Sequence, residues 1–508
     1  MRAKSPERVV IVGGGVTGWM TASYLKAALG DDVALTLVAP GETAAPPDET
    51  SLGDLAQFFD VLQRAEEDWM PACDATYKLA VRFQDFSRPR HHFYLPFEQM
   101  PQADGFPLTE WWLRMQPSGR FDRDCFVAAW LCDAQRSPRH TPGPTPGQDA
   151  ARPPYGYHLD AQALTRYLTA YAVERGVHHL TDEVHDVRLD ARGWIDHVMT
   201  ARHGAVDGDL FIDCTGTRGL LLRRALKVPF VSYQDTLPGD SMVTLRVDAD
   251  MKAHGIPPYT AITAQAAGWT YSIPLLTRIA TGYVYAQEYC TPQEAERTLR
   301  EAAGPEAAGA PATHTTLSFG RSLHAWKHNC VAVGAAAGRV QPLQATAISY
   351  VHHALQQLAP LVAPVAQAVR SGGPHTDLQE HYNTALAQEL DAARDLSTLH
   401  YLGAARQDTQ FWRDAQTCPL PDALAQAIER WRVRPPGTEH QPGPKGLPQH
   451  AHTSILLGTG ALALPPSTAL SPLDDRAARQ EFAALKQRAQ TLVKTLPTQY
   501  DYFSQISA

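Results

Sequence analysis

The stretch V-V-I-V-G-G-G-V-T-G, residues 9–18, decides the fold. Four apolar residues, all of them β-branched, are typical of a buried strand, and they lead directly into a G-x-G-x-x-G turn. Glycines at 13, 15 and 18 allow a tight turn, and the helix that follows offers free N–H groups to a pyrophosphate. Residues 8–38 are therefore predicted to form the first strand, helix and strand of a dinucleotide-binding α/β domain.

Composition excludes several classes of protein. The 508 residues are 44% hydrophobic, which is enough for a large core, and the net charge of −8 without a basic cluster argues against a nucleic-acid partner. The seven cysteines form no C-x-x-C pair, which predicts free thiols in a reducing compartment and no metal site. No apolar run is long enough to span a membrane and no cleavage-site pattern follows the first apolar run, so we expect a cytoplasmic chain with no membrane partner.

The remaining patterns place further elements along the chain. Apolar spacing predicts helices over residues 54–70 and 160–176, and alternation predicts a hairpin over 184–198. Residues 209–216 form a buried strand that ends in a turn of small residues. Segments 141–154 and 434–448 are rich in Pro and Gly and are expected to be surface loops, whereas helical patterns dominate after about residue 345, up to a charged helix over 474–494.

Two further motifs carry a resemblance to a known family. They are A-T-Y-K-L-A-V-R-F at residues 75–83 and G-W-T-Y-S-I-P at 268–274. Together with the glycine turn, they resemble the flavin-dependent tryptophan halogenases. Residues 157–160, 172–177, 211–220 and 399–401 look like family segments as well, so the resemblance runs from Val9 to about Gly460.

The resemblance implies a fold and a chemistry. The fold would be an α/β, flavin-monooxygenase-like domain with a Rossmann-type FAD site and a mostly helical substrate region packed on it. Residues 1–360 would form the discontinuous FAD-binding domain, with substrate-pocket insertions at about 75–155, and residues 361–508 the helical substrate region. FADH2 from a separate flavin reductase, oxygen, and chloride or bromide would then halogenate tryptophan, an indole or another electron-rich aromatic in secondary metabolism.

Site residues follow from the matching positions. Lys78 would deliver the electrophilic halogen, with Gln344 at the second catalytic position. The cofactor set is Gly13, Gly15, Gly18, Ala39, Asp213, Gly216, Gly334 and Ala347, and the halide set is Thr346 and Ala347. The substrate set is His91, His92, Phe93, Phe97, Trp269 and Tyr271, which could equally form an aromatic core, just as an isolated Lys78 would be an ordinary surface lysine.

The chain departs from the family pattern where charge and flexibility matter. The family segment P-L-E-S-T-G-I is P-L-Q-A-T-A-I at residues 342–348, and glutamine at 344 cannot act as a general base near neutral pH. Ala39 stands where an acidic residue holds the ribose hydroxyls. Two prolines interrupt the glycine-rich flavin strap at residues 45–50, where they fix φ and remove N–H donors. The sequence therefore resembles a divergent member of the family that lacks the catalytic glutamate and the usual strap.

Three functions stay open at this point. The first is an active halogenase in which Gln344 is tolerated. The second is a catalytically silent pseudoenzyme that serves as a partner or regulatory subunit, as a homodimer or with a paralogous halogenase. The third is a flavin enzyme with different oxidative chemistry on the same fold.

Overall fold

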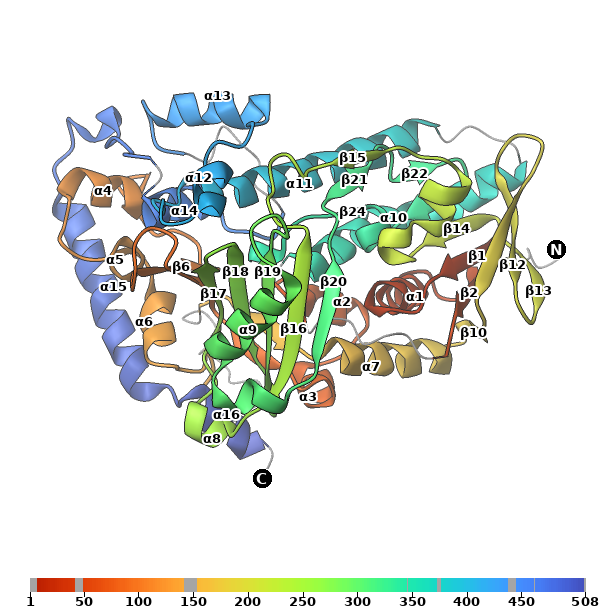
Figure 1. Ribbon diagram of the computed structural model, residues 1–508, viewed down its shortest axis with the longest axis horizontal. Helices are drawn as coiled ribbons and strands as arrows, with labels where there is room; N and C mark the ends of the chain where they lie inside the picture. The colour runs from red at the N-terminus through yellow and green to blue at the C-terminus, as the bar shows by residue number, and fades with distance from the viewer. Residues whose placement is uncertain are drawn as a thin grey trace. The chain divides into compact units, whose positions relative to one another are not determined.

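Two compact units, each assembled from three segments, make up the chain (Figure 1). Unit 1 comprises Met1–Cys73, Leu159–Tyr233 and Ser318–Asp391; unit 2 comprises Asp74–His158, Gln234–Leu317 and Ala392–Ala508. The computed structural model describes residues 7–41, 49–140, 153–344, 346–371, 376–436, 445–460 and 462–506. The expected loops at 141–154 and 434–448 lie mostly outside the described residues, and so does most of the strap.

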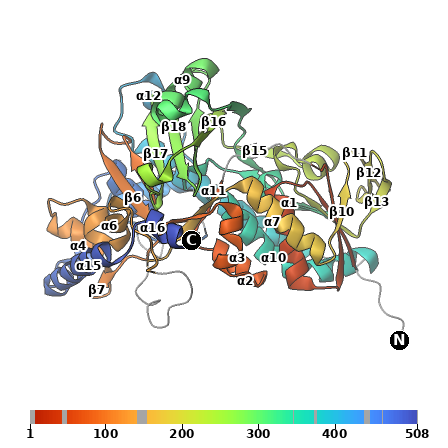
Figure 2. The same ribbon diagram turned by 90° about the horizontal axis from the view of Figure 1, so that it is seen from below.

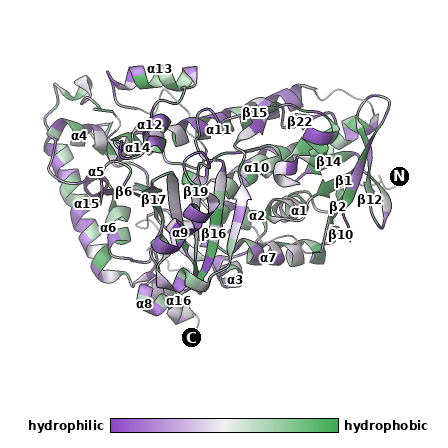
Figure 3. Cartoon of the chain, viewed as in Figure 1, coloured by the Kyte–Doolittle hydropathy of each residue, from purple (hydrophilic) through white to green (hydrophobic). Residues whose placement is uncertain are grey.

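A six-stranded sheet forms the centre of unit 1, with the order β10-β2-β1-β14-β23-β22. Its first five strands are parallel and β22 is antiparallel. The strands are β1 (Glu7–Val12), β2 (Val33–Ala39), β10 (His178–Thr181), β14 (Leu210–Asp213), β22 (Trp326–Lys327) and β23 (Cys330–Ala332). A strand covered on both faces reads as an apolar run, which residues 9–12 of β1 and 210–212 of β14 form, so these strands are largely green in Figure 3.

Helices cover this parallel sheet. Helix α1 (Val16–Leu29) packs on α7 (Ala161–Glu174) and on α10 (Ala347–Ser371), as Figures 1 and 2 show. Smaller elements complete unit 1: the antiparallel sheet of β11 (Val184–Leu189), β12 (Ile195–Thr200) and β13 (Gly204–Asp207); the sheet of β15 (Phe230–Ser232), β21 (Gly320–Ser322) and β24 (Gly338–Arg339); β3 (Glu49–Thr50); and the start of α11 (Thr376–Leu402). The predicted strand–helix–strand start, the helix over 160–176 and the hairpin are thereby confirmed.

The single helix predicted over residues 54–70 is wrong, because the structure has two short helices there. They are α2 (Leu55–Val61) and α3 (Glu66–Trp69). Gln63 has a φ of 53°, and this left-handed residue ends the first helix. The predicted apolar face survives the break, since Phe59 stacks on Trp69 with ring centroids 4.1 Å apart.

Unit 2 is built on a seven-stranded sheet with the order β20-β16-β19-β18-β17-β5-β6. Only the β17–β5 pair is parallel. The strands are β5 (Ala80–Gln84), β6 (His92–Pro96), β16 (Ser241–Asp248), β17 (Tyr259–Gln265), β18 (Gly268–Pro274), β19 (Arg278–Tyr285) and β20 (Ala312–Thr316). Strand β4 (Thr76–Lys78) pairs with β9 (Gly156–Leu159), with Lys78 opposite Gly156.

The rest of unit 2 is mostly helical. Its further elements are β7 (Gln102–Ala103), β8 (Phe106–Pro107), α4 (Leu108–Met115), α5 (Phe121–Cys125), α6 (Val127–Asp133), α8 (Met251–His254), α9 (Pro292–Ala303), α12 (Gln410–Ala415), α13 (Asp422–Trp431), α14 (Ala451–Thr459), α15 (Arg476–Thr495) and α16 (Gln499–Ile506). Helix α15 is the predicted charged helix. The α/β fold class is confirmed, and among the residues described no helix is long and apolar enough to cross a membrane.

Candidate active site

The glycine turn after β1 is shaped by close backbone contacts. A β-carbon on Gly13, whose φ is +118°, would lie 2.3 Å from the carbonyl oxygen of Cys214. One on Gly18 would lie 1.9 Å from the carbonyl oxygen of Gly13. Gly15 is different, because nothing lies within 4 Å of the position its β-carbon would take. Two of the three predicted glycines are thus required by the fold, and the third borders open space.

Helix α1 begins at this open space without a capping side chain. Gly15 is its N-cap residue, no side chain caps the helix, and its first turn holds no acidic residue. The uncapped N–H groups and the positive end of the helix dipole suit a phosphate group. The turn therefore fits the pyrophosphate of a dinucleotide.

Ala39 ends β2 and offers no carboxylate. The residue is 2% exposed, and its methyl group lies 2.4 Å from where a β-carbon on Gly14 would be. Nearby Asp182 does not replace the missing acid, because its carboxylate accepts hydrogen bonds from the N–H groups of Glu183, Arg202 and His203. Ala39 therefore provides no carboxylate for the ribose hydroxyls, which an acidic residue at this position usually binds in this fold.

The side chain of Asp213 stabilises the turn that follows β14 and does not point outward. Its carboxylate is fully buried; one oxygen accepts from the N–H and hydroxyl of Thr215, at 3.0 and 2.6 Å. The other accepts from the N–H groups of Leu221 and Leu222, both at 2.9 Å. These bonds fix the turn at Gly216, whose φ is +64° and whose missing β-carbon borders open space.

The third loop leads from β23 to α10. Gly334, with a φ of +66°, lies against Thr17 of α1. Gln344 and Thr346 are 1% and 3% exposed, and Ala347 begins α10 with an exposed side chain. Ala345 and strap residues 45–48 lie outside the described residues. All of the predicted cofactor and halide residues belong to unit 1.

Lys78 of unit 2 is a buried amine beside an aromatic ring. Its side chain is fully buried and its Nζ lies 5.0 Å from the centroid of the Phe97 ring. Burial holds the pKa of Lys78 well below its usual value of 10.5. It is therefore not the ordinary surface lysine that the residue type alone suggests.

His158 lies in the strand paired with Lys78. Its ring nitrogens contact the hydroxyls of Thr76 and Thr260, at 3.1 and 3.0 Å. Burial holds the pKa of His158 well below 6.5, so its ring is neutral at neutral pH. Sequence reasoning missed this residue, although the motif at 157–160 contains it.

The predicted substrate residues occupy different places in unit 2. Phe97 borders Lys78, whereas Phe93 stacks on Phe83 with centroids 5.2 Å apart. Trp269 is fully buried and donates from Nε1 to the hydroxyl of Tyr401 at 2.9 Å.

The other three contact different neighbours. Tyr271 is half-buried, 6.3 Å from the Trp269 ring. His92 contacts Tyr94 edge to face, and His91 Nδ1 lies 2.7 Å from Ser87 Oγ. Of the predicted substrate residues in the stretch 91–97, Phe97 has its ring beside Lys78.

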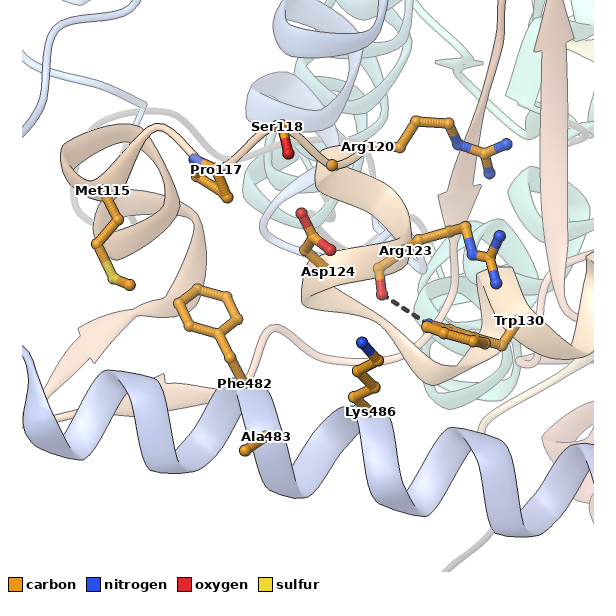
Figure 4. Close-up of a pocket in the computed structure, with 11 residues that line it drawn as sticks. Met115, Pro117, Ser118, Arg120, Arg123, Asp124, Trp130, Phe482, Ala483 and Lys486 are labelled. Atoms are coloured by element: carbon orange, nitrogen blue, oxygen red, sulfur yellow. Dashed lines mark hydrogen bonds between the residues drawn. The ribbon is translucent and has the colours of Figure 1, made fainter.

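A pocket of about 670 Å³ elsewhere in unit 2 is lined by none of the predicted residues. Figure 4 shows Phe482 and Lys486 of α15 on one side and Arg123, Asp124 and Trp130 on the other. Arg123 lies over the Trp130 ring at 4.0 Å from its centroid. This surface pocket is separate from the Lys78 surroundings.

A buried charged cluster in unit 1 was also missed. Asp54, at the start of α2, and Glu389 of α11 both pair with His353 of α10, at 3.1 and 2.6 Å. Hydrogen bonds to the two carboxylates raise the pKa of His353 to about 9, and the histidines hold that of Asp54 below its usual range. The available signal in the sequence was the pair of adjacent histidines at 352 and 353, in a mostly apolar helical stretch.

The geometry defines an α/β protein with a dinucleotide turn in one unit and a buried lysine in the other. Residues 8–473 match the tryptophan halogenase family model. The chain is 53% identical to tryptophan 6-halogenase SttH of Streptomyces toxytricini, over 99% of each chain, and 48% identical to 7-chloro-L-tryptophan 6-halogenase KtzR of Kutzneria sp. (strain 744), over 98% of this chain and 99% of that protein.

Solved structures agree. The SttH crystal structure has a TM-score of 0.93 and covers 99% of this chain and 100% of its own. Tar14, a tryptophan C-6 flavin-dependent chlorinase from taromycin biosynthesis, has a TM-score of 0.92 at 48% identity, with 99% and 100% covered. The chain belongs to the flavin-dependent tryptophan halogenase family.

Gly15 and Gly18 should respond differently to alanine. Gly18→Ala forces a methyl group onto a carbonyl oxygen, and we expect it to lower the free energy of unfolding by about 3 kcal/mol. Gly15→Ala should cost at most about 1 kcal/mol but weaken FAD binding, because the methyl group enters the open space. Urea denaturation and flavin titration measure the two effects. Equal destabilisation by both variants would contradict this distinction.

The His353 ion pairs should make stability depend on pH. The pKa of His353 rises from 6.5 to about 9, so its contribution is complete below about pH 6.5 and is lost as the pH rises through about 9. The lowered pKa of Asp54 makes its contribution present above about pH 4 and lost in stronger acid. We expect the Tm difference between wild type and His353→Gln to shrink across the alkaline range. A difference that stays constant would contradict the assignment.

Proposed function

We propose that this chain is an FAD-dependent halogenase that substitutes L-tryptophan on its indole ring, at C6 by analogy with the relatives named above. The observation that carries the proposal is Lys78: a fully buried amine beside Phe97, in a chain 53% identical to a tryptophan 6-halogenase. Other electron-rich indoles belong to the same substrate class. Residues 1–360 would serve the flavin, with substrate-pocket insertions at about 75–155 that include Lys78, and residues 361–508 would form the rest of the substrate region.

FAD, reduced by a separate flavin reductase, supplies hypohalous acid from oxygen and chloride or bromide when it is bound. Gly15 and the uncapped start of α1 would hold its pyrophosphate. Gly216, Gly334 and the start of α10 lie at loops that follow parallel strands, the usual place for a cofactor in such a sheet. Thr346 and Ala347 would meet the halide at the N-terminus of α10.

Lys78 would carry the halogen. Because burial favours its neutral form, its lone pair can attack hypohalous acid: an N–halogen bond forms, the O–halogen bond breaks, and the amine proton leaves with hydroxide as water. The indole carbon would then attack the halogen as the N–halogen bond breaks, and the departing nitrogen of Lys78 would take up the ring proton, which restores the neutral amine. Phe97 beside the amine would help to orient the indole, so that the position attacked depends on placement.

Gln344 favours a second candidate function. Its amide accepts a hydrogen bond but does not take up a proton at neutral pH, and Ala39 removes a ribose contact as well. These two residues support a catalytically silent partner of a homologous halogenase, or a homodimer with a regulatory role. A flavin enzyme with different oxidative chemistry would bind FAD and consume oxygen without halogenating a substrate.

Lys78→Ala should abolish halogenation and leave FAD affinity unchanged. Lys78→Arg should be equally inactive, because a guanidinium keeps the charge but has no neutral amine to attack the oxidant. Lys252→Ala, at an exposed lysine of the same unit, is the matched control. The assay combines a flavin reductase, chloride or bromide and L-tryptophan, with product detected by mass. Halogenated product from Lys78→Ala would reject the role.

Gln344→Glu should raise activity at least about tenfold if FAD binds, because a positioned base contributes substantially to proton removal. The halogenation assay described above is applied to wild type and to Gln344→Glu, and oxidised FAD is titrated into both proteins. Product from wild type supports an active halogenase. Absence of product and of FAD binding in both forms supports the silent partner, and FAD-dependent oxygen consumption without halogenated product supports different oxidative chemistry.

A further inference from the structure

The carboxylate of Asp54 joins two helices of unit 1. Asp54 immediately precedes α2, and its Oδ1 accepts a hydrogen bond from Ser349 Oγ at 2.8 Å. Its Oδ2 lies 3.1 Å from His353 Nε2. Ser349 and His353 occupy the first two turns of α10, so a single side chain ties that end of the helix to the start of α2.

His353 extends this connection to a third helix. Its Nδ1 lies 2.6 Å from Glu389 Oε1 of α11. The side chains of Asp54, His353 and Glu389 are 9%, 8% and 1% exposed. Removing one member of such a buried set leaves uncompensated charge on the others, so the arrangement is sensitive to the charge of His353. We call these three residues and Ser349 the α10 clamp.

Other titratable groups surround the clamp. His352 of α10 has its Nδ1 3.6 Å from Asp54 Oδ2, and its ring lies 5.8 Å from that of Tyr24 on α1. Tyr350 and Tyr382 are buried, and the charge of Glu389 contributes to raising their pKa values. Neither tyrosine can supply a cation that would replace His353 between the two carboxylates.

The clamp acts on the segment that carries the predicted halide and flavin contacts. Helix α10 begins at Ala347, two residues before Ser349, and Gln344 ends the short turn just ahead of it. A shift of the first turn of α10 would therefore move Thr346 and Ala347. A displacement of about 1 Å is enough to impair a reaction that depends on placement.

We propose that His353 is a positioning residue that, paired with Asp54 and Glu389, fixes the N-terminal turn of α10 in the place that FAD and halide require. The ligand part of this inference rests on the proposed function; the clamp itself rests on the contacts above. Its charge links ligand affinity to pH, because loss of the His353 proton leaves two carboxylates facing a neutral ring.

The test compares His353→Gln with His381→Gln, an exposed histidine of the same unit on α11. Oxidised FAD is titrated into each protein between about pH 6 and pH 10. We expect His353→Gln to bind FAD about tenfold more weakly than wild type at pH 7. Wild type and His381→Gln should lose affinity as the pH rises through the alkaline range, whereas His353→Gln should not change with it. Equal affinity and equal pH dependence in all three folded proteins would overturn the proposal.

Amide hydrogen exchange separates this result from a failure of the proposed function. If wild type binds no FAD, the ligand proposal fails, but exchange over residues 346–350 should still be about tenfold faster in His353→Gln than in His381→Gln. Unchanged exchange there would overturn the clamp. Faster exchange throughout unit 1 would also overturn it, because that result indicates general destabilisation rather than positioning of α10.

Discussion

The close approach of β1 and β14 at their carboxyl ends is the constraint on which unit 1 depends. Cys214 N–H donates to Val12 at 2.9 Å, and the Cys214 carbonyl occupies the space that a side chain on Gly13 would need. The turn can then enter α1 only if residue 18 also lacks a side chain. Helices α7 and α10 pack on α1. The contact between Cys214 and Gly13 therefore also affects the position of the loop that leads from β23 to α10.

Two buried basic side chains, His353 of unit 1 and Lys78 of unit 2, lie in opposite kinds of surroundings. His353 lies between two carboxylates, which stabilise its charged form and raise its pKa. Lys78 lies beside an aromatic ring and a neutral histidine, and burial favours its uncharged form. The first arrangement is suited to holding helices together, and the second leaves an amine able to react.

The parts of the fold that follow from periodicity could be predicted from the sequence. An unbroken apolar run followed by glycines specifies a strand and turn, and the observed β1, α1 and β2 together begin and end within one residue of the predicted unit over residues 8–38. The break at Gln63 could not be predicted, because it depends on a backbone angle that the residue type does not favour. The burial of Lys78 came only from the resemblance, since lysine alone indicates an exposed position. The His353 cluster joins residues 54, 353 and 389, which no local pattern connects.

The glycine motif carries less information about flavin than its spacing suggests. Gly13 and Gly18 are required by contacts within the protein, so this fold would need them even in a chain that had lost its cofactor. Gly15 is the residue whose small size no neighbouring atom demands. Ala39 and Gln344, two of the positions that depart from the family pattern, are both buried and carry no carboxylate, and the methyl group of Ala39 packs against Gly14 of the turn. The contacts that require Gly13 and Gly18 are made within the protein, so the fold does not depend on a bound cofactor.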